Sequence, residues 1–433
     1  MQAVLFSEDA ALTVPPRSNG SINKLDFNDR RFHDWYRFVL SFPAHLVRDY
    51  IDRFGLNKHD VLLDPFCGTG TTLVEAKRLG IPSTGVEANP FASFASSVKT
   101  DWAVDPDGLI SHARLLAGRA KKIISTWNNS NLKVLPEEAQ CLLLKGSISP
   151  LPLHKALALL EQIETDNNAC YKRHELLAFA KTLVCSASNL YFGPEVGVRR
   201  TKKADAPVIE NWLTEVDKIV ADLRMKTCPN APATVYHADA RQLASLLSPE
   251  SISAVFTSPP YPNEKDYTRT TRLESVMLGY INNREELRGL KKGLLRSNSR
   301  NVYKGDDDDG WVTDHAEIQA IAEEIEQRRI TLGKTSGFER QYAKVTKLYF
   351  GGMSRHLAEL RPLLKPGAYL GYVVGDQASF LQVMIRTGRI LADIARSLGY
   401  QVISIDLFRT RLATATRKQM REEVVVLRWP GRQ

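Results

Sequence analysis

The chain has 433 residues and a formal net charge of +9, with 43% hydrophobic and 25% charged residues. This composition is typical of a globular protein and argues against a disordered or fibrous one. No signal peptide or membrane-spanning segment is visible, so we expect a cytoplasmic protein, nucleoid-associated if the source is prokaryotic. The five cysteines show no C-x-x-C pair, which predicts reduced thiols and no zinc site. The positive charge is compatible with a polyanionic partner.

The first predicted elements form a strand, loop, helix and strand unit. Apolar positions at helical spacing predict an amphipathic helix over residues 44–54. A short apolar strand over 61–63 is followed by a glycine-containing turn, a helix over about 71–79 and a strand that ends at Val86.

The remaining chain predicts a helical insertion and a return to strands. The pattern over residues 91–231 predicts a mainly helical insertion, which is a possible DNA-recognition region. Residues 263–334 predict a second, irregular insertion with basic and acidic runs. Short β-branched strands before and after the second insertion alternate with helices. We therefore predict an α/β fold in which 1–90 and 232–433 form one mostly parallel sheet covered on both faces.

The stretch DPFCGTGTT, residues 64–72, connects the first predicted strand to its helix. Gly68 and Gly70 let the backbone turn tightly and approach a ligand closely, because they carry no Cβ. Asp64 at the strand tip could bind a cationic amine, and Glu87 at the end of the next strand could hold both hydroxyls of a ribose. The alternative is a strand-to-helix turn in which the glycines serve geometry alone.

A second unusual stretch, TSPPY, ends the apolar run Ala254–Phe256. Two prolines cannot continue a sheet ladder, so the strand stops there and its end is rigid. Such an end presents a serine hydroxyl, carbonyl groups and an aromatic ring in fixed positions. A simple proline-terminated strand edge is the alternative interpretation.

Together, DPFCGTGTT and TSPPY resemble the S-adenosylmethionine-dependent DNA amino-methyltransferases, which methylate N4 of cytosine or N6 of adenine. The resemblance covers about residues 38–89 and 234–273, with a looser match from residue 349 onward. It implies a Rossmann-like methyltransferase fold, S-adenosylmethionine as cofactor, double-stranded DNA as substrate and, as a further partner, a companion restriction or defence nuclease. It implies cofactor contacts from Phe42, Pro43, Asp64, Pro65, Phe66, Gly68, Gly70, Glu87 and Asp239.

The same resemblance makes Ser258, Pro259, Pro260 and Tyr261 the catalytic residues. The Ser258 side chain and the Pro259 carbonyl would accept the two hydrogens of an exocyclic amine, whose lone pair is otherwise delocalised into the base. Such positioning is a main source of rate in a direct transfer. Tyr261 would stack on the target base, which must leave the duplex to reach the site.

Serine at the first position of SPPY favours the N4-cytosine enzymes within this resemblance. However, many of those enzymes place PPY before the glycine loop, whereas this chain places the glycine loop first. An N6-adenine DNA methyltransferase, an RNA methyltransferase acting on guanine N2 and a catalytically silent DNA-binding protein are the alternatives.

Two charged stretches remain. The basic residues Arg199, Arg200, Lys202 and Lys203 predict an exposed loop that holds DNA phosphates, with a merely solvated loop as the alternative and the run 284–304 as a competitor. The four aspartates at 306–309 fit a solvated loop better than a metal site, and the methyl transfer needs no metal.

Overall fold

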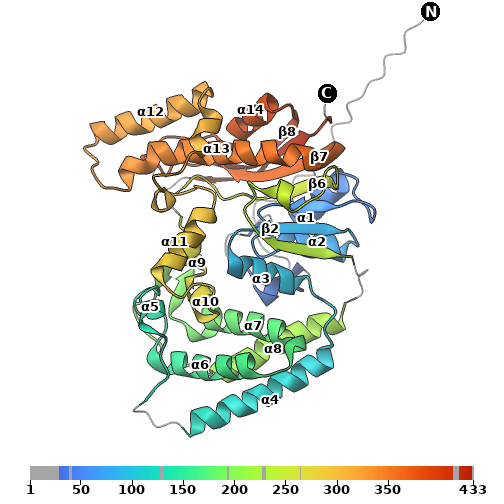
Figure 1. Cartoon of the computed structure of the whole chain (residues 1–433), viewed down its shortest axis with the longest axis vertical. Helices are drawn as coiled ribbons and strands as arrows, with labels where there is room; N and C mark the ends of the chain where they lie inside the picture. Colours follow the sequence, from blue (N-terminus) through green and yellow to red (C-terminus); the bar gives the residue numbers. More distant parts are fainter. Residues whose placement is uncertain are drawn as a thin grey trace, which may run out of the picture.

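The computed structural model describes residues 29–38, 41–126, 131–192, 195–226, 231–263, 265–412 and 419–431. Its main feature is a seven-stranded sheet with the strand order β5-β2-β1-β6-β7-β9-β8 (Figure 1). The strands are β1 (Leu62–Asp64), β2 (Ser83–Glu87), β5 (Ala233–His237), β6 (Ile252–Thr257), β7 (Leu364–Gly375), β8 (Gln401–Leu412) and β9 (Gln419–Arg428).

The sheet is parallel except for β9, which runs antiparallel to both β7 and β8. From β1 the chain proceeds outward through β2 to the edge strand β5 and then returns to β6, directly beside β1. The strand order therefore reverses between β1 and β6, and in open α/β sheets ligands bind at the carboxyl ends of the strands at such a point. The predicted Rossmann-like methyltransferase fold is confirmed.

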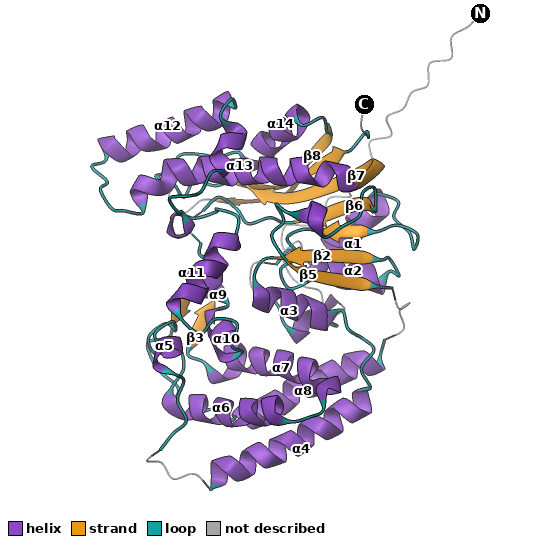
Figure 2. Cartoon of the chain, in the orientation of Figure 1, coloured by secondary structure: helices purple, strands orange, loops and turns teal. Residues whose placement is uncertain are grey.

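Helices cover both faces of the sheet (Figure 2). Helices α12 (Ala316–Thr331), α13 (Tyr342–Leu360) and α14 (Thr387–Ser397) lie on one face, and α1 (Ala44–Arg53) and α2 (Thr71–Arg78) pack on the other. Successive strand residues serve opposite faces, because Leu62 joins the core under α1 whereas Leu63 joins the core under α13. This two-sided burial explains the nearly continuous apolar strands.

A helical layer lies beside the sheet and consists of α4 (Pro106–Ser125), α6 (Pro150–Thr165), α7 (Ala169–Thr182) and α8 (Val208–Arg224) (Figure 1). It also contains the short α5 (Glu137–Gln140) and the hairpin of β3 (Leu190–Phe192) and β4 (Val196–Val198). Helix α3 (Pro90–Lys99), although within the predicted insertion 91–231, packs against β2 and β5. The separate helical layer thus begins after α3, with which it shares one hydrophobic core.

The segment 263–334, expected to be irregular, contains α9 (Tyr267–Thr270), α10 (Arg272–Met277), α11 (Arg284–Gly293) and α12. That prediction was wrong. The reason is clearest for α11, which is mostly charged and has no fully buried residue, so that its two packed leucines, Leu287 and Leu290, are a weak apolar signal in a basic run. Within the described residues, no helix has the length and apolar character needed to cross a membrane.

Candidate active site

The glycine loop between β1 and α2 depends on two left-handed residues. Gly68 has φ +50° and Gly70 has φ +81°, conformations that residues with a Cβ rarely adopt. A Cβ at Gly70 would also lie 2.5 Å from the Ser96 hydroxyl oxygen of α3. The buried Lys99 Nζ donates a 2.7 Å hydrogen bond to the Thr69 carbonyl, and burial lowers the pKa of Lys99 to about 7. Helix α3 therefore supports the glycine loop through Ser96 and Lys99.

Glu87, at the end of β2, is fixed by two backbone N–H groups. The Gly68 N–H donates to one carboxylate oxygen and the Asn89 N–H donates to the other, each at 2.8 Å. Burial raises the pKa of Glu87 to about 7, although these two hydrogen bonds act in the opposite direction. Each oxygen keeps further acceptor capacity, so the half-buried carboxylate can receive two neighbouring hydroxyl groups.

Asp64, at the end of β1, is almost completely buried. Its Oδ1 accepts hydrogen bonds from the Thr257 hydroxyl at 2.6 Å and from the Phe66 N–H at 3.2 Å. Its Oδ2 has no hydrogen-bond partner, and burial raises the pKa of the carboxyl to about 6. An unpaired buried carboxylate oxygen is costly, so this position is suited to a cationic group supplied by a ligand.

The tetrapeptide Ser258 to Tyr261 follows β6 and lies against the end of β7. The Ser258 hydroxyl donates to the Val373 carbonyl at 3.1 Å. A Cβ at Gly375 would lie 2.9 Å from Tyr261 Cε2, so the tyrosine ring rests directly on the backbone of β7. Burial and the nearby Glu422 raise the pKa of Tyr261, which keeps its hydroxyl neutral. The hydrogen bond between Thr257 and Asp64 ties this strand end to β1.

The other predicted cofactor residues surround these acids. The Phe42 ring packs edge-on against Phe256 at 5.8 Å between centroids, and Pro43 stands at the N-terminus of α1. The Phe66 ring, after the buried Pro65, packs edge-on against His356 of α13 at 5.0 Å. The Phe66 contact places the loop after β1 against α13, and the Phe42 contact places the segment before α1 against β6.

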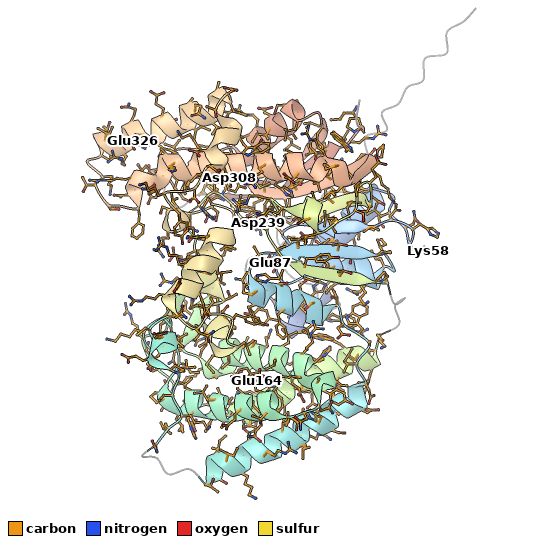
Figure 3. The ribbon with its side chains drawn as sticks, in the orientation of Figure 1. Lys58, Glu87, Glu164, Asp239, Asp308 and Glu326 are labelled. Carbon is orange, nitrogen blue, oxygen red and sulfur yellow. The ribbon has the colours of Figure 1, made fainter. Side chains whose placement is uncertain are left out.

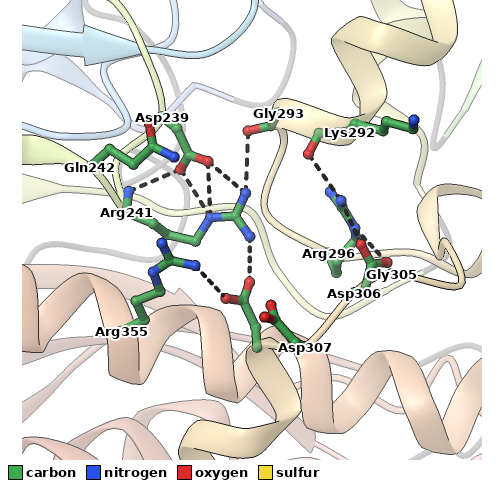
Figure 4. A pocket seen from close by; sticks show the side chains of 11 residues that line it. Asp239, Arg241, Gln242, Lys292, Gly293, Arg296, Gly305, Asp306, Asp307 and Arg355 are labelled. Carbon is green, nitrogen blue, oxygen red and sulfur yellow. Dashed lines mark hydrogen bonds and ion pairs between the residues drawn. The ribbon is translucent and has the colours of Figure 1, made fainter.

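Asp239, beyond β5, is bound by an arginine. The Arg241 guanidinium reaches both carboxylate oxygens, with Nη2 at 2.6 Å from Oδ2, and also pairs with Asp308. Figure 4 shows this cluster at a cavity of about 340 Å³ whose wall includes Asp239, Arg241 and Arg355. The adenine amine of the cofactor, if bound at Asp239, would therefore share the Asp239 carboxylate with the Arg241 guanidinium.

The aspartates at 306–309 do not all form a solvated loop. Asp308 is buried and bound by Arg241 and Arg355, and Asp306 is paired with Arg296 at 2.8 Å. The expected solvated loop was therefore wrong for these two residues. Arg241 and Arg355, both distant in the sequence, neutralise Asp308, and Arg296, ten residues earlier in the chain, neutralises Asp306. In the part of the chain that the structure describes, no group of three or more His, Cys, Asp or Glu residues is arranged to hold a metal ion.

The predicted basic loop follows β4. Arg199, Arg200 and Lys202 are exposed, whereas Lys203 is partly buried. The Lys202 amine donates to the Arg199 carbonyl of the same loop, and the Lys203 amine donates to the Ser186 carbonyl in the helical turn after α7, so these two lysines are partly engaged within the protein.

The structure thus brings Asp64, Glu87, the glycine loop and SPPY together at the carboxyl edge. Figure 3 shows Glu87, Asp239 and Asp308 at this side of the sheet and Lys58 at the opposite side. Sequence reasoning missed Thr257, Lys99 and Arg241, which hold the predicted residues in place. Only Thr257 had a usable signal, its position between the strand and SPPY.

Comparison with known proteins adds independent information. A DNA methylase family model of the N6/N4 type matches residues 18–95. The type II methyltransferase M.BsoBI of Geobacillus stearothermophilus is 25% identical over 92% of this chain and 84% of its own length. M.AvaI of Nostoc sp. is 23% identical over 92% and 86%, respectively. The family model and these two relatives support the assignment of this chain to the S-adenosylmethionine-dependent DNA amino-methyltransferases.

The solved structures add no support to this family assignment. The rRNA methyltransferase aviRa from Streptomyces viridochromogenes has 10% sequence identity over 95% of this chain and 94% of that chain. Its TM-score is 0.29, which is too low to indicate a shared topology.

The residues at the carboxyl edge of the methyltransferase fit S-adenosylmethionine, its methyl donor. Asp64 offers a buried oxygen without a partner to a cationic group, and Glu87 offers two fixed oxygens to a pair of hydroxyls. Gly68 and Gly70 leave the intervening backbone open to close approach. The donor set is therefore appropriate for a cofactor that carries a positive charge at one end and a ribose further along.

Proposed function

We propose that this DNA methyltransferase modifies the exocyclic amine of a base flipped out of double-stranded DNA, and that the base is cytosine, methylated at N4. The observation that supports this proposal is the hydrogen bond from the Ser258 hydroxyl to the Val373 carbonyl. A hydroxyl has one hydrogen to donate and two lone pairs to accept. Because its hydrogen is already used, Ser258 meets an incoming amine as an acceptor.

Two acceptors at the amine would raise its reactivity. The Ser258 oxygen would accept one amine hydrogen and the Pro259 carbonyl the other, which draws the nitrogen toward a tetrahedral shape and frees its lone pair. Pro260 and Pro259 fix the chain, so these acceptors need not be ordered at each turnover. Tyr261, supported by β7, would stack on the ring of the base.

S-adenosylmethionine supplies an electrophilic methyl group. Asp64 would hold its cationic amine and Glu87 its ribose hydroxyls, while Phe42, Pro43, Pro65 and Phe66 enclose the site. Asp239 would bind the adenine amine together with Arg241. The basic residues Arg199, Arg200, Lys202 and Lys203 are candidates to hold DNA phosphates.

N6 of adenine is the second candidate, because the glycine loop precedes SPPY in this chain and the chosen base is not fixed by the tetrapeptide. The relatives M.BsoBI and M.AvaI are named type II methyltransferases. By analogy we propose that this enzyme works in the cytoplasm and protects DNA against a companion restriction nuclease with the same target sequence.

Tritium transfer from labelled S-adenosylmethionine to duplex DNA and to tRNA tests this function, followed by mass spectrometry of the nucleosides. We expect labelled DNA that contains N4-methylcytosine. N6-methyladenine would select the second candidate, whereas 5-methylcytosine would overturn the mechanism. Label in tRNA alone would make the enzyme an RNA methyltransferase, and no transfer would make it a DNA-binding protein without activity.

A further inference from the structure

Helix α11 and the segment after it carry several exposed cations close together in the chain. Arg284, Arg288, Lys292, Arg300 and Lys304 are all exposed, and we call these five the α11 basic surface. Within the described residues, none of these five side chains forms an ion pair, in contrast to surface cations such as Lys121, Arg224 and Arg389. The charge of this surface is therefore available to an external partner.

The helix presents these cations on one side. Leu287 and Leu290 pack against the core of the helical layer, whereas Arg284, Arg288 and Lys292 follow one another at a spacing of four residues. Residues at this spacing lie one above the other along a helix. The apolar side thus anchors α11 and the basic side faces solvent.

An aromatic ring limits the freedom of two of these cations. The Arg288 guanidinium lies 5.7 Å and the Lys292 amine 5.9 Å from the centre of the Tyr303 ring. Such contacts contribute about 0.5–1 kcal/mol at exposed sites. Arg296 packs on the same ring but is buried and paired with Asp306, so it supports the ring and adds no free charge. Because the Arg288 and Lys292 side chains are already restricted by the ring, they would lose less conformational entropy when a partner binds.

The α11 basic surface is joined to the chain directly after the catalytic tetrapeptide. The Asn263 N–H donates to the Ser297 carbonyl at 2.9 Å, and the Lys291 amine binds Asp266 at 2.6 Å. Lys292 also contributes to the cavity wall near Asp239, and its amine points away from the Arg241 cluster (Figure 4). Residues 284–304 are therefore held beside the chain segment that follows Tyr261.

We infer that the α11 basic surface binds the sugar-phosphate backbone of the duplex beside the flipped nucleotide. This inference rests on the proposed function and adds where the DNA is held. Phosphates recur along DNA and attract unpaired lysine and arginine side chains, with release of counterions. The core of a protein interface is depleted in charge and enriched in apolar groups, and residues 284–304 expose no large apolar side chain.

The test compares two double variants of the full chain in duplex DNA binding over a range of salt concentrations. One is Arg288→Ala with Lys292→Ala. The matched control is Arg114→Ala with Lys122→Ala, which removes one arginine and one lysine, also exposed and without a described ion pair, from α4 at the outer side of the helical layer (Figure 1). Cofactor affinity and circular dichroism establish that each variant is folded.

We expect the α11 variant to bind about eightfold more weakly at 0.1 M salt for each phosphate that it no longer neutralises, with the slope of log affinity against log salt reduced by about 0.9 per phosphate. Its preferred sequence should stay the same, because phosphate contacts carry no base information. The α4 variant should bind like the parent.

Parental affinity and slope in the α11 variant would overturn the inference, as would an equal loss of affinity in the α4 variant or a stronger effect on RNA than on DNA. These outcomes are independent of the proposed function. A parent that binds DNA through α11 but transfers no methyl group would refute the function alone, and a methylating parent with an unaffected α11 variant would refute the inference alone.

Discussion

The site has two halves that are built from different chemical groups. The half at the ends of β1 and β2 uses two carboxylates, Asp64 and Glu87, held by hydrogen bonds from the backbone and from Thr257. The half at the ends of β6 and β7 presents a hydroxyl, two prolines and a tyrosine whose raised pKa keeps it neutral. Negative charge suits a cationic cofactor, whereas neutral acceptors suit the uncharged exocyclic amine of a base. Separate substitutions should therefore separate binding from transfer.

The largest effect is expected from Glu87→Ala. This change removes the acceptor of the Gly68 and Asn89 N–H groups and, under the proposed function, of two cofactor hydroxyls. Hydrogen bonds to charged groups contribute about 1.5–3 kcal/mol each, so removal of the two hydroxyl hydrogen bonds should weaken S-adenosylmethionine binding at least roughly 100-fold. Calorimetry measures the affinity. Parental affinity in this variant would remove Glu87 from the cofactor half.

Ser258→Ala should affect transfer and not cofactor binding. Removal of one acceptor positioned at the reacting group should lower kcat about 10²- to 10³-fold, by analogy with the removal of one hydrogen-bonding group at a transition state. Single-turnover methylation measures this rate. Ser253→Ala is the matched control, because Ser253 lies near the opposite end of β6 and its hydroxyl binds Val61 and Lys365. A rate decrease of the same size in both variants would contradict the distinction between the two halves.

The smallest expected effect is a pH dependence confined to the cofactor half. The pKa of Glu87 is raised to about 7, so its protonation below this pH should weaken cofactor affinity by up to about tenfold per pH unit. For the free protein, the raised pKa adds stability that is full below about pH 4.5 and is lost as the pH rises through 7. Affinity titrations and thermal unfolding from pH 5 to 8 measure both effects.

Glu87→Gln should flatten the affinity profile, at a lower affinity throughout. The remaining slope would come from Asp64, whose pKa is raised to about 6. A profile in Glu87→Gln with the parent's shape near pH 7 would assign the titration to another group.

The sequence predicted the parallel sheet well, because buried strands such as β6 read as short apolar runs and the glycines of the first loop mark a turn. Asp64, Glu87 and Ser258 were recognisable for the same reason, since each stands where an apolar strand ends. The contacts that support this edge were less predictable. Thr257 binds Asp64 across two strands. Lys99 binds the Thr69 carbonyl and Arg241 binds Asp308, in both cases between residues at least 30 positions apart in the sequence.

The two charged stretches show the limit of composition. A run of aspartates normally indicates solvated chain, but Arg241, Arg296 and Arg355 bind two of them in a partly closed cluster. Gly351 of α13 permits the approach, because a Cβ there would lie 1.8 Å from the Asp308 carbonyl oxygen. Likewise, the freedom of the cations on α11, compared with the engaged Lys202 and Lys203, depends on neighbours that only the fold supplies.

The position of the helical layer in the chain also affects how the protein folds. Ser83 of β2 pairs with Ala233 of β5, so the whole helical layer lies between two adjacent strands. Closing so long a loop costs conformational entropy, and each doubling of loop length adds about 0.6 kcal/mol. The contacts among α4, α6, α7 and α8 lie wholly within this loop, so the helical layer can assemble before this pairing and shorten the effective loop. We therefore expect the edge strand that leads to Asp239 to be completed late in folding, and cleavage of the chain within the helical layer to disturb the β5 edge before it disturbs β6 and β7.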